Sequence, residues 1–240
     1  MKRFHFEFRE TIATVMAEND ALYHAAKDGM MRARHEVERC IAADPFFLST
    51  FSPYRPSEGG RTIQRMVSAG ESAGVGPMAS VAGAIAWAGL EAMMEAGATG
   101  GTIDNGGDIA LLPDRGMSIG IYAGNSPLSG KFAFFMPPSH EIVAVCTSSA
   151  TVGHSISLGI ADAVTVFGSN PAAADAWATA ICNALTPEDL GIFDRLEGSA
   201  AAAGDVNGVF AIFGDLAIRW GSIPRMKPAR VDPDLITRGM

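Results

Sequence analysis

A glycine-rich acidic stretch at residues 103–109 carries side chains suited to binding a charged ligand. It reads Ile-Asp-Asn-Gly-Gly-Asp-Ile, so acidic residues stand on both sides of Asn105, Gly106 and Gly107. Glycines accept positive φ angles and let a ligand reach backbone N–H groups without a Cβ in the way. An ordinary Asn-Gly turn is one interpretation of these letters. The strand-like residues on both sides favour another, a bulged strand that carries the two glycines.

Hydroxyl groups cluster in a second stretch, residues 146–155. Thr147, Ser148 and Ser149 are consecutive, and a glycine and His154 follow them. Several hydrogen-bond donors in a small space suit phosphate or pyrophosphate oxygens, and a histidine adds a group that titrates near neutral pH. The alternative is a polar turn with a histidine on the surface.

A carboxylate and a hydroxyl are paired in a third stretch that has the composition of a helix. Asp175 and Thr179 are four residues apart, so on a helix they lie one above the other on the same face. Both are hard oxygen ligands, which suit Mg²⁺ shared with the phosphates of a substrate. A local contact between two side chains of a packed helix is the alternative.

Several catalytic motifs are absent from the sequence. It contains neither a phosphate-binding Gly-x₄-Gly-Lys-Ser/Thr loop nor a His-Glu-x-x-His zinc motif. Residues 70–74 match Gly-x-Ser-x-Gly around Ser72, but no buried strand precedes them and Pro77 begins the next helix too late for a nucleophile elbow. These classes of phosphate-binding protein and hydrolase are therefore disfavoured.

Composition limits the partners and the location. The 240 residues are 48% hydrophobic and 18% charged, as expected for a compact globular protein, and a net charge of −8 disfavours nucleic acid and anionic membranes as partners. Three widely spaced cysteines without a Cys-x-x-Cys pair, Cys40, Cys146 and Cys182, predict reduced and mostly buried thiols. The N-terminus lacks the apolar segment of a secretory signal, so the cytoplasm is the expected location.

One uncharged stretch, residues 72–90, is long enough to span a bilayer. It consists mainly of alanine and glycine and includes a proline, so its transfer into lipid gains little free energy. A buried helix over residues 78–96 is expected instead of a membrane span.

The hydrophobic periodicity predicts an α+β fold, an antiparallel sheet covered by buried helices. Its elements are, in order, a hairpin over residues 3–17, a helix over 19–43, a connector at 45–70, the helix over 78–96, an antiparallel meander of four strands over 102–147, a strand over 163–167, a helix over 171–185, a short helix opening at 186 and a hairpin over 209–220. We expect a single domain, with an N-terminal unit at residues 1–44, the connector, a core at 71–222 and a poorly ordered tail within 223–240.

The order and spacing of these motifs over residues 71–183 resemble an ApbE-like family related to FAD:protein FMN transferases. The matching segments are residues 76–86, the Asn-Gly-Gly-Asp-Ile loop, residues 147–155 and residues 174–179. The resemblance implies a T-fold-like architecture with a site for FAD or FMN and for Mg²⁺.

The resemblance also implies roles for individual residues. Gly106, Gly107 and Asp108 look like the Gly-Gly-Asp loop of the family, and His154 looks like its histidine. Asp175 and Thr179 look like its metal ligands, which a backbone carbonyl near Ala84 completes. The loop at residues 104–108 is then one wall of a nucleotide pocket, and residues 147–154 are expected to form the opposite wall.

Two departures from the family leave the function open. Trp87 and Ala88 stand where the transferases carry lysine and glycine, and no Asp-Pro-x-Thr-Gly segment follows His154. One hypothesis is a Mg²⁺-dependent flavin or nucleotidyl transferase, with Asp108 or His154 in proton transfer. The others are a binding module for a flavin or similar phosphorylated ligand without turnover, and an assembly protein. A homo-oligomer is expected because the content of apolar residues is high and sheet edges invite self-association.

Overall fold

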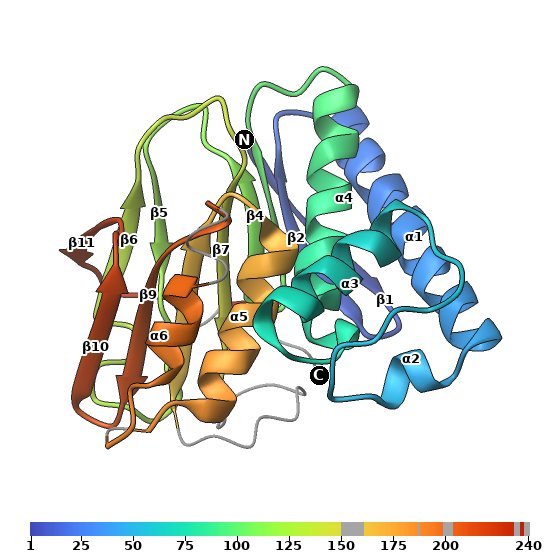
Figure 1. Cartoon of the computed structure of the whole chain (residues 1–240). Coiled ribbons are helices and arrows are strands. Elements are labelled where there is room, and N and C mark those ends of the chain that lie inside the picture. The colour runs from blue at the N-terminus through green and yellow to red at the C-terminus, as the bar shows by residue number, and fades with distance from the viewer. Residues whose placement is uncertain (150–160, 187, 199–203, 233–235, 238–240) are drawn as a thin grey trace.

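A computed structural model describes residues 1–149, 161–186, 188–198, 204–232 and 236–237 (Figure 1). The strands are β1 (Lys2–Phe8), β2 (Thr11–Ala17), β3 (Gly101–Asn105), β4 (Asp108–Leu112), β5 (Met117–Gly120), β6 (Phe132–Met136), β7 (Val143–Ser148), β8 (Ala163–Gly168), β9 (Val206–Phe213), β10 (Leu216–Gly221) and β11 (Arg225–Pro228). The helices are α1 (Asp20–Ala43), α2 (Phe46–Ser49), α3 (Arg61–Ala73), the 3₁₀ helix η1 (Pro77–Ser80), α4 (Val81–Glu95), α5 (Pro171–Ala184) and α6 (Ile192–Leu196).

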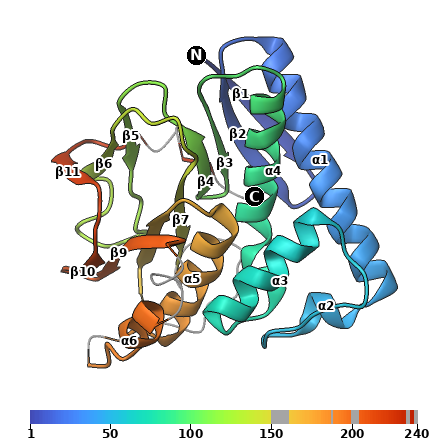
Figure 2. The ribbon, with the colours of Figure 1, turned by 45° about the horizontal axis from the view of Figure 1, so that its top comes forward.

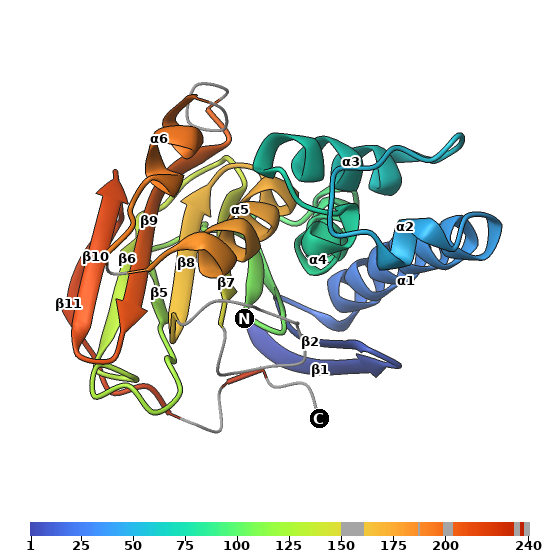
Figure 3. The same ribbon diagram turned by 60° about the horizontal axis from the view of Figure 1, so that its bottom comes forward.

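The strands form two antiparallel sheets. The larger sheet has eight strands in the order β1-β2-β3-β4-β7-β8-β9-β10, and the smaller has three in the order β11-β6-β5. Helices cover one face of the larger sheet (Figure 3), and the smaller sheet lies on its other face (Figure 2). The predicted α+β class with an antiparallel sheet under buried helices is confirmed.

Local sequence signals account for where the long helices begin. Asn19 precedes α1, and its side chain accepts a hydrogen bond from the backbone N–H of Leu22 at 3.0 Å. Asn170 does the same for Ala173 at the start of α5, where Pro171 occupies the first turn without losing a helical hydrogen bond. The predicted boundaries of both helices are therefore close to the observed ones.

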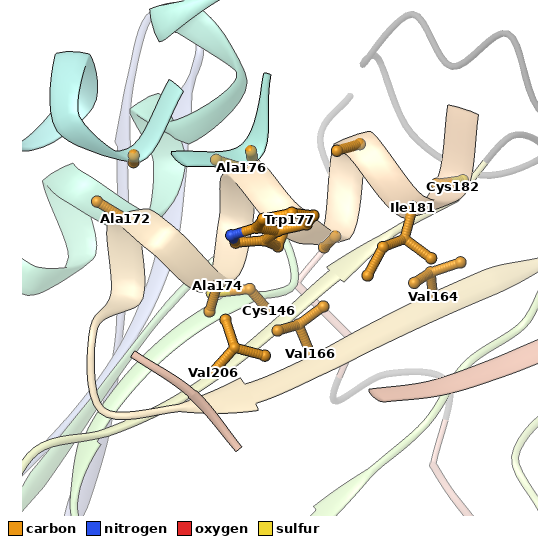
Figure 4. Close-up of a cluster of buried hydrophobic side chains, with 14 of the residues drawn as sticks. Cys146, Val164, Val166, Ala172, Ala174, Ala176, Trp177, Ile181, Cys182 and Val206 are labelled. Carbon is orange, nitrogen blue, oxygen red and sulfur yellow. The ribbon is translucent and has the colours of Figure 1, made fainter. Parts of the chain in front are cut away.

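Helix α5 packs on the larger sheet mainly through apolar side chains (Figure 4). Ile181 points from the helix towards Val164 of β8, and Trp177 and Val166 belong to the same buried cluster. The indole Nε1 of Trp177 donates to Ser72 Oγ at 3.2 Å, so the serine of the Gly-x-Ser-x-Gly match lies inside α3 and binds a core side chain. This hydrogen bond ties α5 to α3, and the position of Ser72 inside a helix confirms that these letters form no nucleophile elbow.

Several predicted elements differ from the structure. The four-strand meander is wrong: residues 102–112 form two strands, while β5 and β6 leave for the smaller sheet, so that β7 pairs with β4. The connector ends at Gly60, because residues 61–70 belong to α3. The short helix begins at Ile192 rather than at residue 186. Alternation of apolar residues gave the strands but not their partners, which depend on packing across the whole chain.

The tail also differs from its prediction in the part that the structure describes. Residues 225–228 form β11, and the N–H groups of Ala229 and Val231 donate to the carbonyls of Lys131 and Gly130. The three cysteines are buried, as predicted. The organisation as a single domain stays a prediction.

Within the described ranges, no single helix is both long and apolar enough to cross a membrane. Residues 61–73 and 77–95 meet the length and hydropathy criteria only when they are taken together, and the chain bends by 105° between them.

Candidate functional site

The Asn-Gly-Gly-Asp segment is the turn of the β3–β4 hairpin. Asn105 pairs with Asp108, and the two residues between them, Gly106 and Gly107, have φ angles of 69° and 103°. Two central residues with positive φ are typical of the two-residue turns whose twist matches that of antiparallel strands. The Asp104 side chain adds to the turn by accepting the Gly107 N–H at 2.9 Å. The predicted bulged strand is therefore wrong, and the ordinary turn is the correct interpretation.

Replacing Gly107 with alanine is expected to destabilise the protein by about 1–2 kcal/mol, because a Cβ disfavours this φ angle. No atom lies close enough to clash, since the nearest neighbour of the new Cβ would be the Thr147 carbonyl oxygen at 3.8 Å. Urea unfolding measures the change. Gly106→Asn is the matched control, because asparagine tolerates a φ near 69°. Equal loss of stability in both variants would contradict a purely conformational origin.

Strand alternation divides the predicted site residues between the two faces of the larger sheet. Asp108 and Cys146 are directly opposite each other on β4 and β7 and face the helices. Ala110, two residues after Asp108 on β4, faces the same way. Asp104 and Thr147 face the smaller sheet. The turn that joins β3 to β4 thus lies at the edge between two chemically different surfaces.

On the helix face, Asp175 completes the start of α4. The first N–H groups of a helix have no partner within it, and the side chain of Ser80, which precedes α4, makes no cap hydrogen bond. Asp175 Oδ2 accepts the N–H of Gly83 at 2.8 Å. A Cβ on Gly83 would collide with the Pro171 carbonyl and with Asp175, so the glycine permits the close approach of α4 and α5.

The Asp108 carboxyl lies near Asp175 in the same buried region. Its Oδ1 atom is inaccessible to solvent and has no hydrogen-bond partner among the described residues. Burial, followed by the charges of Asp175 and Asp104, raises the pKa of Asp108 well above its ordinary value. Burial raises the pKa of Asp175 to about 7, although hydrogen bonds from the Gly83 and Ala82 N–H groups lower it. Each carboxyl of this buried pair therefore holds a proton at higher pH than a solvent-exposed aspartate does.

Asp108 has Asn105 and Cys146 as its neighbours on the adjacent strands. Burial and the charges of Asp108 and Asp175 raise the pKa of the Cys146 thiol well above its ordinary value, so it stays protonated. Its Sγ atom donates to the Pro171 carbonyl at 3.5 Å. Asn105 Nδ2 donates to the Ala82 carbonyl at 3.1 Å and ties the end of β3 to the first turn of α4.

The remaining predicted metal ligands lie on the same two helices. Ala84 is buried in α4 and directly follows Gly83, and Thr179 is half-buried one turn after Asp175 on α5. Among the described residues, no group of three or more His, Cys, Asp or Glu side chains is placed to hold a metal ion. The unpartnered Asp108 oxygen beside Asp175 nevertheless has the chemistry of a cation ligand.

On the other face, a cavity of about 920 Å³ lies between the two sheets. Its floor on the larger sheet is rich in hydroxyls and includes Thr147 and Thr165, whose Oγ1 atoms are 2.9 Å apart. Apolar side chains of the smaller sheet and its flanks, Met117, Ile119 and Ile121, form the opposite side. A cavity with one polar and one apolar side suits a flat ring system that carries polar groups.

Residues 147–149, the described part of the hydroxyl segment, do not lie opposite the glycine turn, although the resemblance implied that residues 147–154 form an opposite wall. Strands β4 and β7 are neighbours, and the Thr147 N–H donates to the Gly107 carbonyl at 3.2 Å, so the two segments lie side by side. Ser149 lines the cavity, whereas Ser148 is buried at the end of β7. His154 lies outside the described residues.

The sequence interpretation placed Asp104 in the loop that forms a pocket wall but gave its side chain no role, and it missed Thr237. Asp104 lines the cavity on the same face of β3 as Thr102, two residues before it. Thr237 of the tail binds Asp104 Oδ2 at 2.7 Å, and no local pattern signals this contact.

Trp87 packs against Arg65, a contact that the sequence analysis did not predict. The Arg65 guanidinium lies 3.7 Å from the centre of the Trp87 ring and forms an ion pair with Glu91 at 2.7 Å. A cation therefore lies next to Trp87, although its charge is already balanced by a carboxylate.

A family model described as "AbpE bacteria" matches residues 1–203 of the chain. The chain belongs to this family. Proteins called "UPF0280 protein" from Methanosphaerula palustris and Methanoculleus marisnigri are similar to this member of the AbpE family along its whole length. They are 55% and 56% identical to it over 239 residues, which cover 100% of this chain and 99% and 96% of theirs.

Solved structures of ApbE proteins have a similar fold. The ApbE protein of Thermotoga maritima has a TM-score of 0.56 at 10% identity, and the match covers 91% of this chain and 97% of that protein. The flavin transferase ApbE of Vibrio cholerae has a TM-score of 0.54 at 11% identity, covering 92% and 97%. At such low identity the likeness concerns the fold, which agrees with the expected ApbE-like architecture.

Proposed function

We propose that this protein binds a flavin nucleotide, FAD or FMN, or a similar phosphorylated ligand, and that it is a Mg²⁺-dependent flavin or nucleotidyl transferase. The observation that carries the proposal is the buried pair Asp108 and Asp175, with one unpartnered oxygen, on the helix face of the larger sheet. The Gly106–Gly107 turn next to Asp108 lines a cavity on the other face that is large enough for a ring system. The flavin is suggested by the names of the structural neighbours, which are flavin and flavinyl transferases.

Each predicted site residue has a place in this proposal. Bound Mg²⁺ would neutralise phosphate charge. Asp175, Thr179 and a carbonyl near Ala84 would hold it. Asp108, whose raised pKa lets it hold a proton at neutral pH, would give or take a proton, and His154 is the alternative group for this step.

The cavity and the turn would bind the rest of the ligand. The hydroxyls of Thr147 and Ser149 would bond the polar edge of a ring, and Asn105 ties the end of β3 to α4. Ser148 is buried at the end of β7 between these two hydroxyls in the sequence. Gly106 and Gly107 leave the backbone at the turn open to a phosphate, since a Cβ on either residue would meet no atom closer than 3.8 Å.

Titration with FAD and FMN tests the proposal. We expect quenching of flavin fluorescence on binding, tighter with Mg²⁺ than with EDTA, and release of AMP from FAD in the presence of an acceptor protein. Asp175→Asn should abolish the effect of Mg²⁺. If the protein binds neither FAD nor FMN, the proposed function is wrong.

Binding without turnover is the second candidate, and the ring of Trp87 where the transferases carry lysine favours it. Saturable flavin binding with no AMP formed over hours would support it. A homo-oligomer and a cytoplasmic location are also proposed, and sedimentation at several concentrations tests the first. The unpaired edges of β1 and β10 in the larger sheet are where copies could associate.

A further inference from the structure

The described part of the tail is fastened along the smaller sheet. Strand β11 pairs with β6, and beyond it the N–H groups of Ala229 and Val231 donate to the carbonyls of Lys131 and Gly130, both at 2.9 Å. These bonds continue the ladder of the sheet past the end of the strand. They carry the chain from the sheet edge to the rim of the cavity, which residues 229–232 line.

A missing side chain makes room for the tail at this rim. Gly120 ends β5, and a Cβ placed on it would lie 2.5 Å from Cγ2 of Val231. Real Cβ atoms do not approach other atoms so closely, so a Cβ at position 120 would force the Val231 side chain to move. The backbone of Gly120 has no positive φ angle, so the requirement for glycine comes from Val231 alone.

A second contact fastens the tail to the floor of the cavity. The Thr237 hydroxyl lies 2.7 Å from Asp104 Oδ2 and 2.9 Å from Thr14 Oγ1. When Asp104 is ionised it only accepts hydrogen bonds, so Thr237 donates to it and accepts from Thr14. The tail therefore reaches from the smaller sheet to β2 and β3 of the larger one.

The tail leaves most of the cavity between the two sheets unfilled. The cavity volume of about 920 Å³ includes the tail residues as lining, and pockets for small molecules measure roughly 300–1,000 Å³. The tail is thus a wall of the cavity and does not fill it. The family model ends at residue 203, so this wall lies beyond the part of the chain that the model matches.

From these contacts we infer that residues 229–232 and 236–237 form an integral wall of the ligand cavity. Val231 against Gly120 and Thr237 against Asp104 position this wall so that it retains a bound ring. The inference rests on the proposed function for the identity of the ligand. The tail residues are positioning residues, because they act by holding the wall in place.

Gly120→Ala tests the inference in the full-length protein, because the new Cβ displaces the Val231 side chain while the sequence of the tail stays the same. We expect FMN or riboflavin to dissociate about tenfold faster, since loss of a wall acts mainly on the dissociation rate. Gly120→Ala combined with Val231→Ala restores the space and should recover most of the slow release. Thr237→Val, remote from β5, should also speed release. Thermal melting of each variant separates this effect from unfolding.

Unchanged release from a folded Gly120→Ala variant would overturn the inference and leave the proposed function standing. If the wild type binds neither FMN, FAD nor riboflavin, the proposed function fails and amide hydrogen exchange decides the inference alone. Protection of the Ala229 and Val231 amides that falls about tenfold in Gly120→Ala supports the wall. Amides that exchange at the unfolded rate in the wild type refute it.

Discussion

Raising the pH of the metal-free protein is expected to lower its free energy of unfolding. Asp175 has a pKa of about 7 in the folded state against 3.8 for the free group, so between these values the folded state binds more protons than the unfolded one. Stability then falls as pH rises. Three pKa units correspond to about 4 kcal/mol as an upper bound. Most of this loss should occur between about pH 4 and about pH 7, and Asp108, whose pKa is also raised, should extend it to higher pH.

Thermal melting in EDTA at several pH values measures the effect. Because Asp108 and Asp175 lie close together, they should titrate as a pair. Asp175→Asn is the control, and it should flatten the pH dependence because the amide does not ionise. If Mg²⁺ binds there, it should restore stability at alkaline pH more than at acid pH, because it needs the ionised carboxylate. Equal melting temperatures of the wild type across this range would contradict the buried pair.

Two substitutions at Asp175 are expected to have opposite effects on stability. Asp175→Ala leaves the Gly83 N–H without an acceptor in a buried position, which costs about 1–3 kcal/mol. Asp175→Asn keeps an oxygen for that N–H, and its amide group can donate to the nearby Asp108. Its stability should therefore match or exceed that of the wild type above about pH 7, because the variant lacks the repulsion between two ionised carboxylates.

Both substitutions should weaken Mg²⁺-dependent flavin binding about tenfold or more, because each removes a carboxylate ligand. Urea unfolding and flavin titration on the same samples separate the two roles of Asp175. Thr186→Ala, at an exposed hydroxyl away from the site, is a control for nonspecific effects on binding. Full Mg²⁺-dependent binding by Asp175→Asn would exclude this residue as a metal ligand and leave it as a cap of α4.

The comparison of prediction and structure separates local from distant information. The hairpin at residues 3–17 and the starts of α1 and α5 were predictable, because alternation and the caps at Asn19 and Asn170 act within a few residues. The turn at Gly106 and Gly107 was misjudged as a bulge. Strand-like residues flank a bulge as well as a hairpin turn, and only the pairing of Asn105 with Asp108 distinguishes the two.

The site was predicted in its members more than in its arrangement. The sequence identified Asp108 and Asp175 separately, but they meet only because α5 packs next to β4 on the sheet. Two features hold α5 there, its close approach to α4 at Gly83 and the buried core around Trp177. The raised pKa values follow from that burial, which no spacing of residues expresses. The assignment of Thr147 to the cavity face and Asp108 to the helix face likewise depends on which side of the sheet each core covers.

The sequence by itself determined most of the helices and strands and the chemical types available at the site, because these depend on backbone preferences and neighbours along the chain. Only the tertiary structure decided that the two glycines form a hairpin turn, that β5 and β6 form a second sheet, that the cavity lies between the sheets and that residues 229–232 line its rim. Contacts such as Val231 with Gly120 and Thr237 with Asp104 join residues far apart in the chain. Packing of the whole molecule selects them, and no local pattern encodes them.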